Sequence, residues 1–381
     1  MRNFIAKKYR GLDSGLSLDT EAISKYGDLI DLSIGDTDIV TDERVIDAAF
    51  RDAKRGYTHY GDPKGDPELI AELCRTWRED FGQMIEPERV LVTASSGLGM
   101  EMALLAVLEP GEEVIVPSPC YPVYRDQIAV AGGVCVDVPL FSSENFEIRR
   151  ERLERAVTSR TKAVIFNNPN NPTGMVYDRA TTQLIADFAR DHDLLVIADE
   201  IYTDYVFTGA FTPMRTLPGM AARTVTLGSF SKNYLMTGWR VGSTIAEPEL
   251  IETMNYINGA LIYSAPSISQ RAAICALRER KRIRERYIAE YRERVEYAAD
   301  RVQGIPYLGL VRPQGTFYLF PSIKAEISSE RFCSALLERA HVLTAPGSTF
   351  GPSGEGHFRI ACTVGKDKLC EAFDRMEKLK F

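Results

Sequence analysis

The segment Leu194-Leu-Val-Ile-Ala-Asp-Glu-Ile-Tyr202 begins with five apolar residues and then places two carboxylic acids side by side. A continuous apolar run is typical of a strand buried on both faces of a mostly parallel sheet. Ligands of open α/β sheets bind at the carboxyl ends of such strands. An acid is costly to bury there unless it is paired. Asp199 is therefore a candidate partner for a buried cation, and the alternative is a helix N-cap.

The same kind of short apolar segment recurs along the middle of the chain. The candidate strands are Val90–Thr93, Val114–Pro117, Val134–Val138, Ala163–Phe166, Leu194–Ala198, Val225–Leu227 and Gly242–Ala246. Helical patterns fit between them, for example at Gly99–Leu108 and Thr181–Asp191. This alternation predicts an α/β fold, in which helices sandwich a large and mostly parallel seven-stranded sheet.

The pattern changes after residue 265, where residues 266–302 predict one long helix. Apolar residues recur every four positions on one face of it, at Ile283, Tyr287, Tyr291 and Val295. Two strands and a helix are expected beyond it, at Gly315–Phe320, His357–Cys362 and Ser329–Ala340. We expect residues 46–278 to form a large domain, and residues 1–45 plus 279–381 to form a smaller α+β domain.

Composition excludes several classes of protein. The 381 residues are 45% hydrophobic and 26% charged, which is ordinary globular usage for two or three domains. The net charge of −7 predicts no general attraction to nucleic acid or to an anionic membrane. No apolar run approaches the roughly 20 residues of a membrane span. Seven cysteines without a C-x-x-C pair and four histidines without ligand spacing predict no metal site and a cytoplasmic protein.

A lysine motif follows the strand at Val225–Leu227. It reads Ser229-Phe-Ser-Lys-Asn-Tyr-Leu-Met-Thr-Gly-Trp-Arg-Val-Gly242. Lys232, just beyond a buried strand and flanked by small hydroxyl side chains, suits an amine that forms a Schiff base. Ser229, Ser231 and Arg240 are suited to hold a phosphate. An isolated Ser-x-Ser-Lys would more simply be a surface turn, but the Gly-x-Arg-x-Gly that follows favours a functional site.

Two loops that follow strands carry further polar groups. The loop 167–174 has two prolines and a glycine, which predict a rigid loop whose asparagine can donate to a phenolic oxygen. Asn-Pro by itself is only a common turn signal. The loop 93–99 lies between a strand and a helix, and its small residues leave backbone N–H groups available for an anion. It lacks the third glycine of a dinucleotide-binding motif.

Taken together, these segments resemble the class I and II aminotransferases, the fold-type-I enzymes of pyridoxal 5′-phosphate. The resemblance runs from about Gly35 to the C-terminus and rests on an ordered set of motifs. They are Tyr60-Gly-Asp-Pro-Lys-Gly65, the Ser95–Gly97 loop, Pro117-Ser-Pro-Cys-Tyr121, Asn170-Asn-Pro-Thr-Gly174, Asp199-Glu-Ile-Tyr202, Ser229-x-Ser-Lys232, Gly238-x-Arg-x-Gly242, Gly315-Thr-Phe-Tyr318 and Phe358-Arg-Ile360.

The resemblance implies how the cofactor would be held. Lys232 would bind it covalently and later move a proton, and Asp199 would pair with the pyridine nitrogen. Asn171 and Tyr202 would hold the phenolic oxygen, and Tyr121 would stack on the ring. The phosphate would be bound by Ser95, Ser96, Gly97, Ser229, Ser231 and Arg240.

The resemblance also implies a homodimer with shared sites, because Tyr60 would reach the phosphate of the neighbouring subunit. The substrate α-carboxylate would be clamped by Arg359, with Asn171 and the backbone of Gly35 nearby. The catalytic residues would be Lys232, Asp199 and Tyr202.

The implied reaction is a ping-pong transfer of an amino group from an L-amino acid to a 2-oxo acid. A carbon–sulfur β-lyase on the same fold and a non-catalytic ligand-sensing module are the alternatives. In the aspartate-specific subgroup an arginine stands three residues before a Tyr-Ser-x-Pro run. Here Ala260 precedes Tyr263-Ser-Ala-Pro266, so we expect neutral donors. The alternative, for an acidic donor, is an arginine or lysine from the N-terminal arm or the partner subunit, with Lys7, Lys8 and Arg10 as sources.

Overall fold

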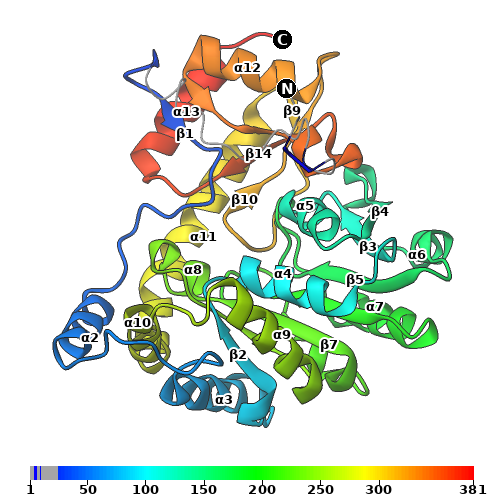
Figure 1. Cartoon of the computed structure of the whole chain (residues 1–381). Helices are drawn as coiled ribbons and strands as arrows, with labels where there is room; N and C mark the ends of the chain where they lie inside the picture. Colours follow the sequence, from blue (N-terminus) through cyan, green and yellow to red (C-terminus); the bar gives the residue numbers. More distant parts are fainter. Residues whose placement is uncertain (1–3, 7–8, 10–24) are drawn as a thin grey trace.

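The computed structural model describes residues 4–6, 9 and 25–381, and its centre is the expected seven-stranded sheet (Figure 1). The strand order is β2-β8-β7-β6-β5-β3-β4, and only the pairs of β8 are antiparallel. The strands are β2 (Val90–Thr93), β3 (Glu113–Ser118), β4 (Val134–Pro139), β5 (Thr161–Asn167), β6 (Leu195–Asp199), β7 (Thr224–Ser229) and β8 (Gly242–Ile245). The predicted α/β fold class is confirmed, with strand ends that differ by one to a few residues.

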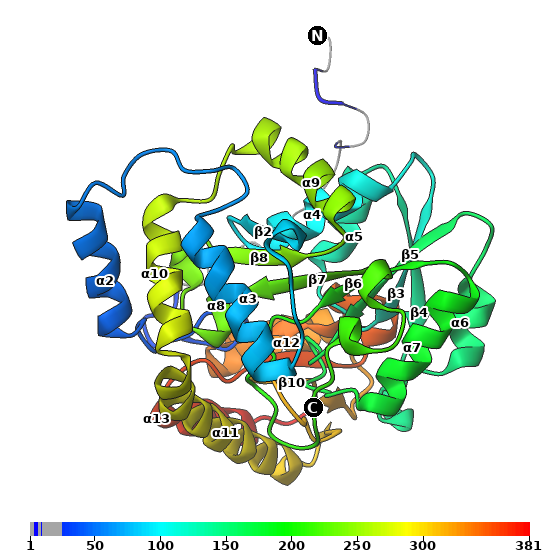
Figure 2. The same ribbon diagram turned by 90° about the horizontal axis from the view of Figure 1, so that it is seen from below.

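Helices cover both faces of this sheet because successive residues of each strand point to opposite sides (Figure 2). On β6, Ile197 packs against one face with α4 (Ser96–Val107), α5 (Val123–Val130) and α9 (Pro248–Leu261). Its neighbours Val196 and Ala198 pack on the other face with α6 (Arg150–Ala156) and α7 (Arg179–Asp191). Both faces of β6 are therefore buried, as its continuous apolar sequence predicts.

The prediction of one helix over 266–302 is wrong. The segment forms two helices, α10 (Ser267–Arg278) and α11 (Arg280–Gly304), separated at Glu279, whose ψ of 5° lies outside the helical range. The apolar stripe expected on α11 is buried, but α10 packs against different helices. It lies against α2 (Glu43–Lys54) and α3 (Pro67–Phe81), whereas α11 runs on toward the C-terminal unit (Figure 2).

The C-terminal unit is built from short strands and two helices, α12 (Ser329–Ala340) and α13 (Lys366–Glu377). Its three-stranded sheet has the order β10 (Tyr318–Leu319), β14 (Phe358–Ala361) and β13 (Ala345–Pro346). A second small sheet pairs β9 (Leu308–Gly309) with β11 (Ser322–Ile323). The strands are shorter than expected, but the helix over 329–340 has the predicted bounds.

An early segment of the chain also joins this unit. β1 (Ile30–Asp31) pairs in parallel with β12 (Val342–Leu343), although more than 300 residues separate them (Figure 1). The pairing places residues 30–31 in the C-terminal unit, and the assignment of residues 1–45 and 279–381 to one small domain stays a prediction. Among the described helices, none is both long enough and apolar enough to cross a membrane.

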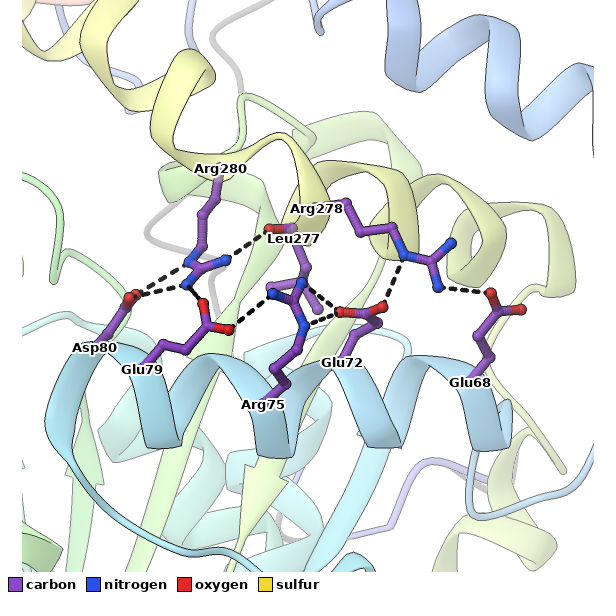
Figure 3. Close-up of polar contacts among 8 residues, drawn as sticks. All are labelled: Glu68, Glu72, Arg75, Glu79, Asp80, Leu277, Arg278 and Arg280. Carbon is purple, nitrogen blue, oxygen red and sulfur yellow. Dashed lines mark hydrogen bonds and ion pairs between the residues drawn. The ribbon is translucent and has the colours of Figure 1, made fainter.

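The junction of α10 and α11 is held to α3 by a ladder of ion pairs (Figure 3). Arg278 bonds to Glu72 at 2.7 Å and to Glu68 at 2.8 Å. Arg280 bonds to Asp80 at 3.1 Å and also to Glu79. The two arginines differ in burial, because the side chain of Arg280 is 3% exposed and that of Arg278 is 49% exposed.

This difference in burial predicts unequal stabilities for two matched variants. Arg280→Ala should lower the free energy of unfolding by about 2 kcal/mol, because it removes a buried cation and leaves Asp80 and Glu79 with only Arg284 and Arg75 among the described residues. Arg278→Ala should cost less than about 1 kcal/mol, since its ion pairs are solvent-screened. Urea unfolding of both variants beside the parent measures the difference. Equal losses of unfolding free energy in the two variants would contradict the prediction that Arg280 stabilises this junction more than Arg278 does.

Candidate active site

A cavity of about 410 Å³ lies at the carboxyl ends of β5, β6 and β7, where residues of the C-terminal unit also reach it. From the sheet it is lined by Asn167, Asp199 and Ser229, and from the other side by Tyr318 and Arg359. All but one of the residues expected in the site line this cavity: Gly35, Ser95, Ser96, Gly97, Tyr121, Asn171, Asp199, Tyr202, Ser229, Ser231, Lys232, Arg240 and Arg359. The exception is Tyr60.

Asp199 ends β6 beside Asn167 of β5, with which it is in register. It is 6% exposed, and its Oδ2 accepts a hydrogen bond from the Tyr124 hydroxyl. Oδ1 is buried and has no partner among the described residues. Burial raises the pKa of Asp199 to about 6, and the Tyr124 hydrogen bond opposes this shift. No described helix is capped by Asp199, so the arrangement favours a partner for a cation over the N-cap alternative.

Lys232 lies on the short helix α8 (Phe230–Asn233), whose N-cap Ser229 accepts a hydrogen bond from the Ser231 N–H. The Lys232 amine donates to the Gly35 carbonyl oxygen at 2.6 Å. Position 35 has no room for a side chain, because a Cβ there would lie 1.8 Å from the Tyr318 hydroxyl oxygen. The glycine thus lets the backbone approach the lysine from the opposite wall of the cavity.

One end of the cavity is built to receive an anion. The N-terminus of α4 opens into it, with Ser95 as N-cap accepting from the Leu98 N–H at 3.0 Å. Arg240 is exposed, donates to the Thr237 carbonyl at 2.9 Å, and forms no ion pair with any residue that the structure describes. The backbone of Arg240 has a positive φ of 54°, which is uncommon for a residue other than glycine. These donors suit a phosphate group.

The other end presents a buried guanidinium. Arg359 is 3% exposed, donates to Asn171 Oδ1 at 3.0 Å and to the Ser33 carbonyl, and lies over the Tyr318 ring at 4.5 Å. Within the described part of the chain it has no carboxylate partner, and its Nε lacks a hydrogen bond. A buried and uncompensated arginine is suited to a carboxylate ligand.

The lining residues that received no role from the sequence include Tyr124, Asn167 and Tyr318. Asn167 had a usable signal, because it follows the apolar run Ala163–Phe166 at a strand end, as Asp199 follows its own. Tyr318 stood in the Gly315–Tyr318 motif without a role, and Tyr124 had no signal, since a tyrosine in an apolar context equally predicts a core residue.

Tyr60, and Ala260 at the position compared with the aspartate-specific subgroup, lie away from this cavity. Tyr60 is 88% exposed and packs edge-on against Tyr263, with ring centroids 5.3 Å apart. Ala260 is exposed near the end of α9 and does not line the cavity. Lys7, Lys8 and Arg10 lie outside the described residues. In the described part of the chain, no cluster of histidine, cysteine and acidic residues is suited to bind a metal.

The groups present fit pyridoxal 5′-phosphate. The free oxygen of Asp199 suits a protonated ring nitrogen, Arg240 and the serines suit a phosphate, and the Lys232 amine suits an aldehyde. Tyr121, which is half-buried in the cavity wall, offers a ring for stacking. These features are complementary to three different groups of one cofactor.

The electrostatics of Asp199 predict that the cofactor-free protein gains stability when this charge is removed. Below about pH 4 the carboxyl is neutral in both the folded and unfolded chain. Between about pH 4 and 6 the unfolded chain loses this proton while the folded protein still holds it, so stability falls across that window and stays lower above it. At pH 8 the free energy of unfolding of Asp199→Asn, measured with urea, should therefore exceed that of the parent by up to about 3 kcal/mol. This gain in stability should vanish near pH 4.

Asp42→Asn is the matched control for this variant. The Asp42 side chain is 7% exposed and its burial acts to raise its pKa, but the Arg282 guanidinium at 2.6 Å outweighs burial and holds the pKa of Asp42 below its usual value. Substitution of Asp42 should therefore destabilise the protein at pH 8. A loss of stability at pH 8 in Asp199→Asn would contradict the prediction and indicate a cation partner within the protein.

Comparisons with known proteins identify the family of this chain. The family described as aminotransferase class I and II matches residues 27–376. The aspartate aminotransferase of Pyrococcus horikoshii is 35% identical over 363 residues, which cover 94% of this chain and 92% of that protein. The aromatic-amino-acid aminotransferase 2 of Thermococcus litoralis is 36% identical over 358 residues, covering 92% and 91%.

A solved structure is similar along almost the whole chain. The aspartate aminotransferase from Thermus thermophilus with maleate has a TM-score of 0.93 and 31% identity, and the match covers 99% of this chain and 100% of that one. The large sheet and its helices are those of the fold-type-I pyridoxal-phosphate enzymes. Because the family match spans nearly all of the described residues, the chain belongs to the class I and II aminotransferases.

Proposed function

We propose that this protein uses pyridoxal 5′-phosphate to move an amino group from an L-amino acid to a 2-oxo acid by a ping-pong mechanism. The observation that carries the proposal is the convergence of Lys232, Asp199 and Arg359 on one cavity. An amine, a buried carboxyl with a free oxygen and a buried guanidinium without an ion pair are together complementary to the cofactor and an amino acid.

Each residue has a role that follows from its contacts. When bound, the cofactor supplies an electron sink for breaking a bond at the substrate Cα. Asp199 Oδ1 holds a proton on the ring nitrogen, and Tyr124 orients that carboxyl through Oδ2. Lys232 Nζ takes the proton from the substrate Cα. Arg359 binds the α-carboxylate, and Asn171, whose Oδ1 accepts from Arg359, keeps its amide N–H₂ for a phenolic oxygen.

A homodimer with shared sites is part of the proposal. The turn that carries Tyr60 is fixed on the surface, since Asn258 donates to the Pro63 carbonyl at 3.0 Å and Ser267 to the Tyr57 carbonyl at 3.2 Å. Large apolar side chains are exposed around it, at Tyr57, Tyr60, Tyr256, Leu261, Ile262 and Tyr263. Such a patch is typical of an interface. A cytoplasmic location is also proposed, supported by seven cysteines that are all free.

A turnover assay tests the reaction. Protein supplied with pyridoxal 5′-phosphate should convert an amino donor only when a 2-oxo acid is added, and should form the matching new amino acid. Lys232→Ala should reduce the rate on the order of 10³-fold or more, since proton transfer at Cα is lost. Lys162→Ala, a half-exposed lysine outside the cavity, is the control and should retain activity.

The same assay separates the alternatives. Ammonia and pyruvate released from a sulfur-containing donor without added oxo acid would favour the β-lyase. Protein that stays colourless with added cofactor would favour the ligand-sensing module.

The donor side chain is predicted to be neutral. The basic residues among the described lining of the cavity are Lys232, Arg240 and Arg359, and the proposed roles use all three. A second carboxylate would therefore be buried without a cation, which should cost aspartate on the order of 10²-fold in kcat/KM against a neutral donor. If position 260 reaches the active site of the partner subunit, Ala260→Arg should supply the missing cation there. The ratio of kcat/KM for a neutral donor to kcat/KM for aspartate should then fall. Aspartate as the best donor of the unaltered protein would refute the prediction.

Complementation between two inactive variants tests the shared site. Dimers that combine a Tyr60→Phe subunit with a Lys232→Ala subunit contain one site free of both substitutions, so they should recover about half of the parental rate per dimer. Lys232→Ala homodimers set the baseline. Full activity in a monomer, measured across a dilution series by light scattering and rate, would rule the arrangement out.

A further inference from the structure

Tyr318 lies between the groups that the proposed function assigns to the cofactor and those it assigns to the substrate. It is on β10, is 2% exposed, and lines the cavity. Its hydroxyl lies 3.2 Å from the hydroxyl of Tyr202, and its ring lies under the guanidinium of Arg359 at 4.5 Å. One side chain thus contacts two site residues through two different parts of itself.

The hydrogen bond between the Tyr318 and Tyr202 hydroxyls can run in either direction, and only one direction leaves the Tyr202 proton available to a ligand. Burial and the neighbouring Tyr318 raise the pKa of Tyr202 well above its usual value, so Tyr202 keeps its proton. If Tyr202 donates that proton to an oxygen in the cavity, the bond between the tyrosines must run from Tyr318 to Tyr202. Donation to the Tyr202 oxygen polarises its O–H and makes it the stronger donor.

The position of the Tyr318 hydroxyl is confined from the other side. Because a Cβ at position 35 would lie 1.8 Å from this oxygen, only a glycine there leaves the hydroxyl in place. Besides Tyr318, the charged and titratable residues around Tyr202 in the described part of the chain include Arg359, Asp199, Tyr124 and Tyr205, and Lys232 lines the same cavity.

The ring has a separate effect on Arg359. Its guanidinium is bonded to Asn171 Oδ1 and to the Ser33 carbonyl through its two terminal nitrogens. The face of the Tyr318 ring limits the remaining freedom of the guanidinium plane, and the Phe350 ring lies 4.8 Å from it as well. A carboxylate bound by a guanidinium in a fixed plane loses less freedom on binding.

We propose that Tyr318 is a positioning residue with two separable effects: its hydroxyl strengthens the Tyr202 hydrogen bond to the phenolic oxygen of the cofactor, and its ring orients Arg359 for the substrate α-carboxylate. The proposal rests on the proposed function. It adds a coupling between the cofactor end and the substrate end of the site through a residue of the C-terminal unit.

Two substitutions separate the effects, because Tyr318→Phe removes only the hydroxyl and Tyr318→Leu removes the ring as well. The first readout is the pH midpoint of the visible absorption band of protein loaded with pyridoxal 5′-phosphate. A donor to the phenolic oxygen stabilises its negative charge and weakens its hold on a neighbouring proton. Both variants should therefore raise the midpoint, by roughly half a pH unit, as expected for one weakened hydrogen bond.

The second readout is the inhibition constant of 3-phenylpropanoate, a carboxylate without an amine. Tyr318→Phe should leave it within about twofold, whereas Tyr318→Leu should raise it about fivefold or more through the lost cation–π contact. Tyr318→Met serves in place of the leucine variant if that protein does not fold. Tyr177→Phe is the control, because its buried hydroxyl bonds to the Phe146 carbonyl at 3.3 Å outside the cavity, and it should change neither value.

An unchanged midpoint in Tyr318→Phe would overturn the effect of the hydroxyl. Equal inhibition constants in the phenylalanine and leucine variants would overturn the effect of the ring. A parent protein that forms no visible band with pyridoxal 5′-phosphate would instead overturn the proposed function itself, so the two failures are distinguishable.

Discussion

Burial of the Asp199 carboxyl at the end of the central strand is the constraint on which the rest of the site depends. β5 and β6 end in register, so this acid lies beside Asn167 with one oxygen bonded to Tyr124 and the other free. Its raised pKa reflects the cost of a charge in that place. A bound cation would relieve the cost, which is why the protein is complementary to a protonated ring nitrogen. Stability and function are therefore opposed at this residue, as is common at active sites.

The site is complete only because two units of structure meet over it. The sheet supplies Asp199 and Lys232, and the C-terminal unit supplies Arg359. Hydrogen bonds cross the cavity from Lys232 to Gly35 and from Arg359 to Asn171. Pairing of β1 with β12 brings the chain before Gly35 into the C-terminal unit, next to the cavity. A ligand that binds between the units would contact both, so its binding and their relative position are coupled.

Short segments rich in apolar residues predicted all seven strands of the sheet. The signal was clearest where a strand is buried on both faces, as in β6, because such a strand has no polar alternation. It was weaker at the edge strand β4, whose residues are mostly half-buried or exposed. The single helix predicted over 266–302 was wrong for a physical reason. The apolar periodicity continues through the break, so it did not reveal where one helix ends. Arg280 forms ion pairs with Glu79 and Asp80 at the break, and α10 and α11 pack against different elements. Ion pairs between residues 200 positions apart leave no periodic signal in the sequence.

The sequence by itself determined the α/β class, the order of the motifs and the polar residues at strand ends, because strand burial and small-residue turns are local properties. Tertiary structure alone decided that Tyr124 and Tyr318 have a place in the site, whereas the motifs had already implied Tyr121 and Tyr202. Tyr124 and Tyr318 are buried aromatics, and only their hydroxyl partners distinguish them from the core. Likewise, only the folded chain leaves Tyr60 on an exposed apolar surface, away from the cavity of its own subunit. Such contacts join residues far apart in the chain, so no spacing rule records them.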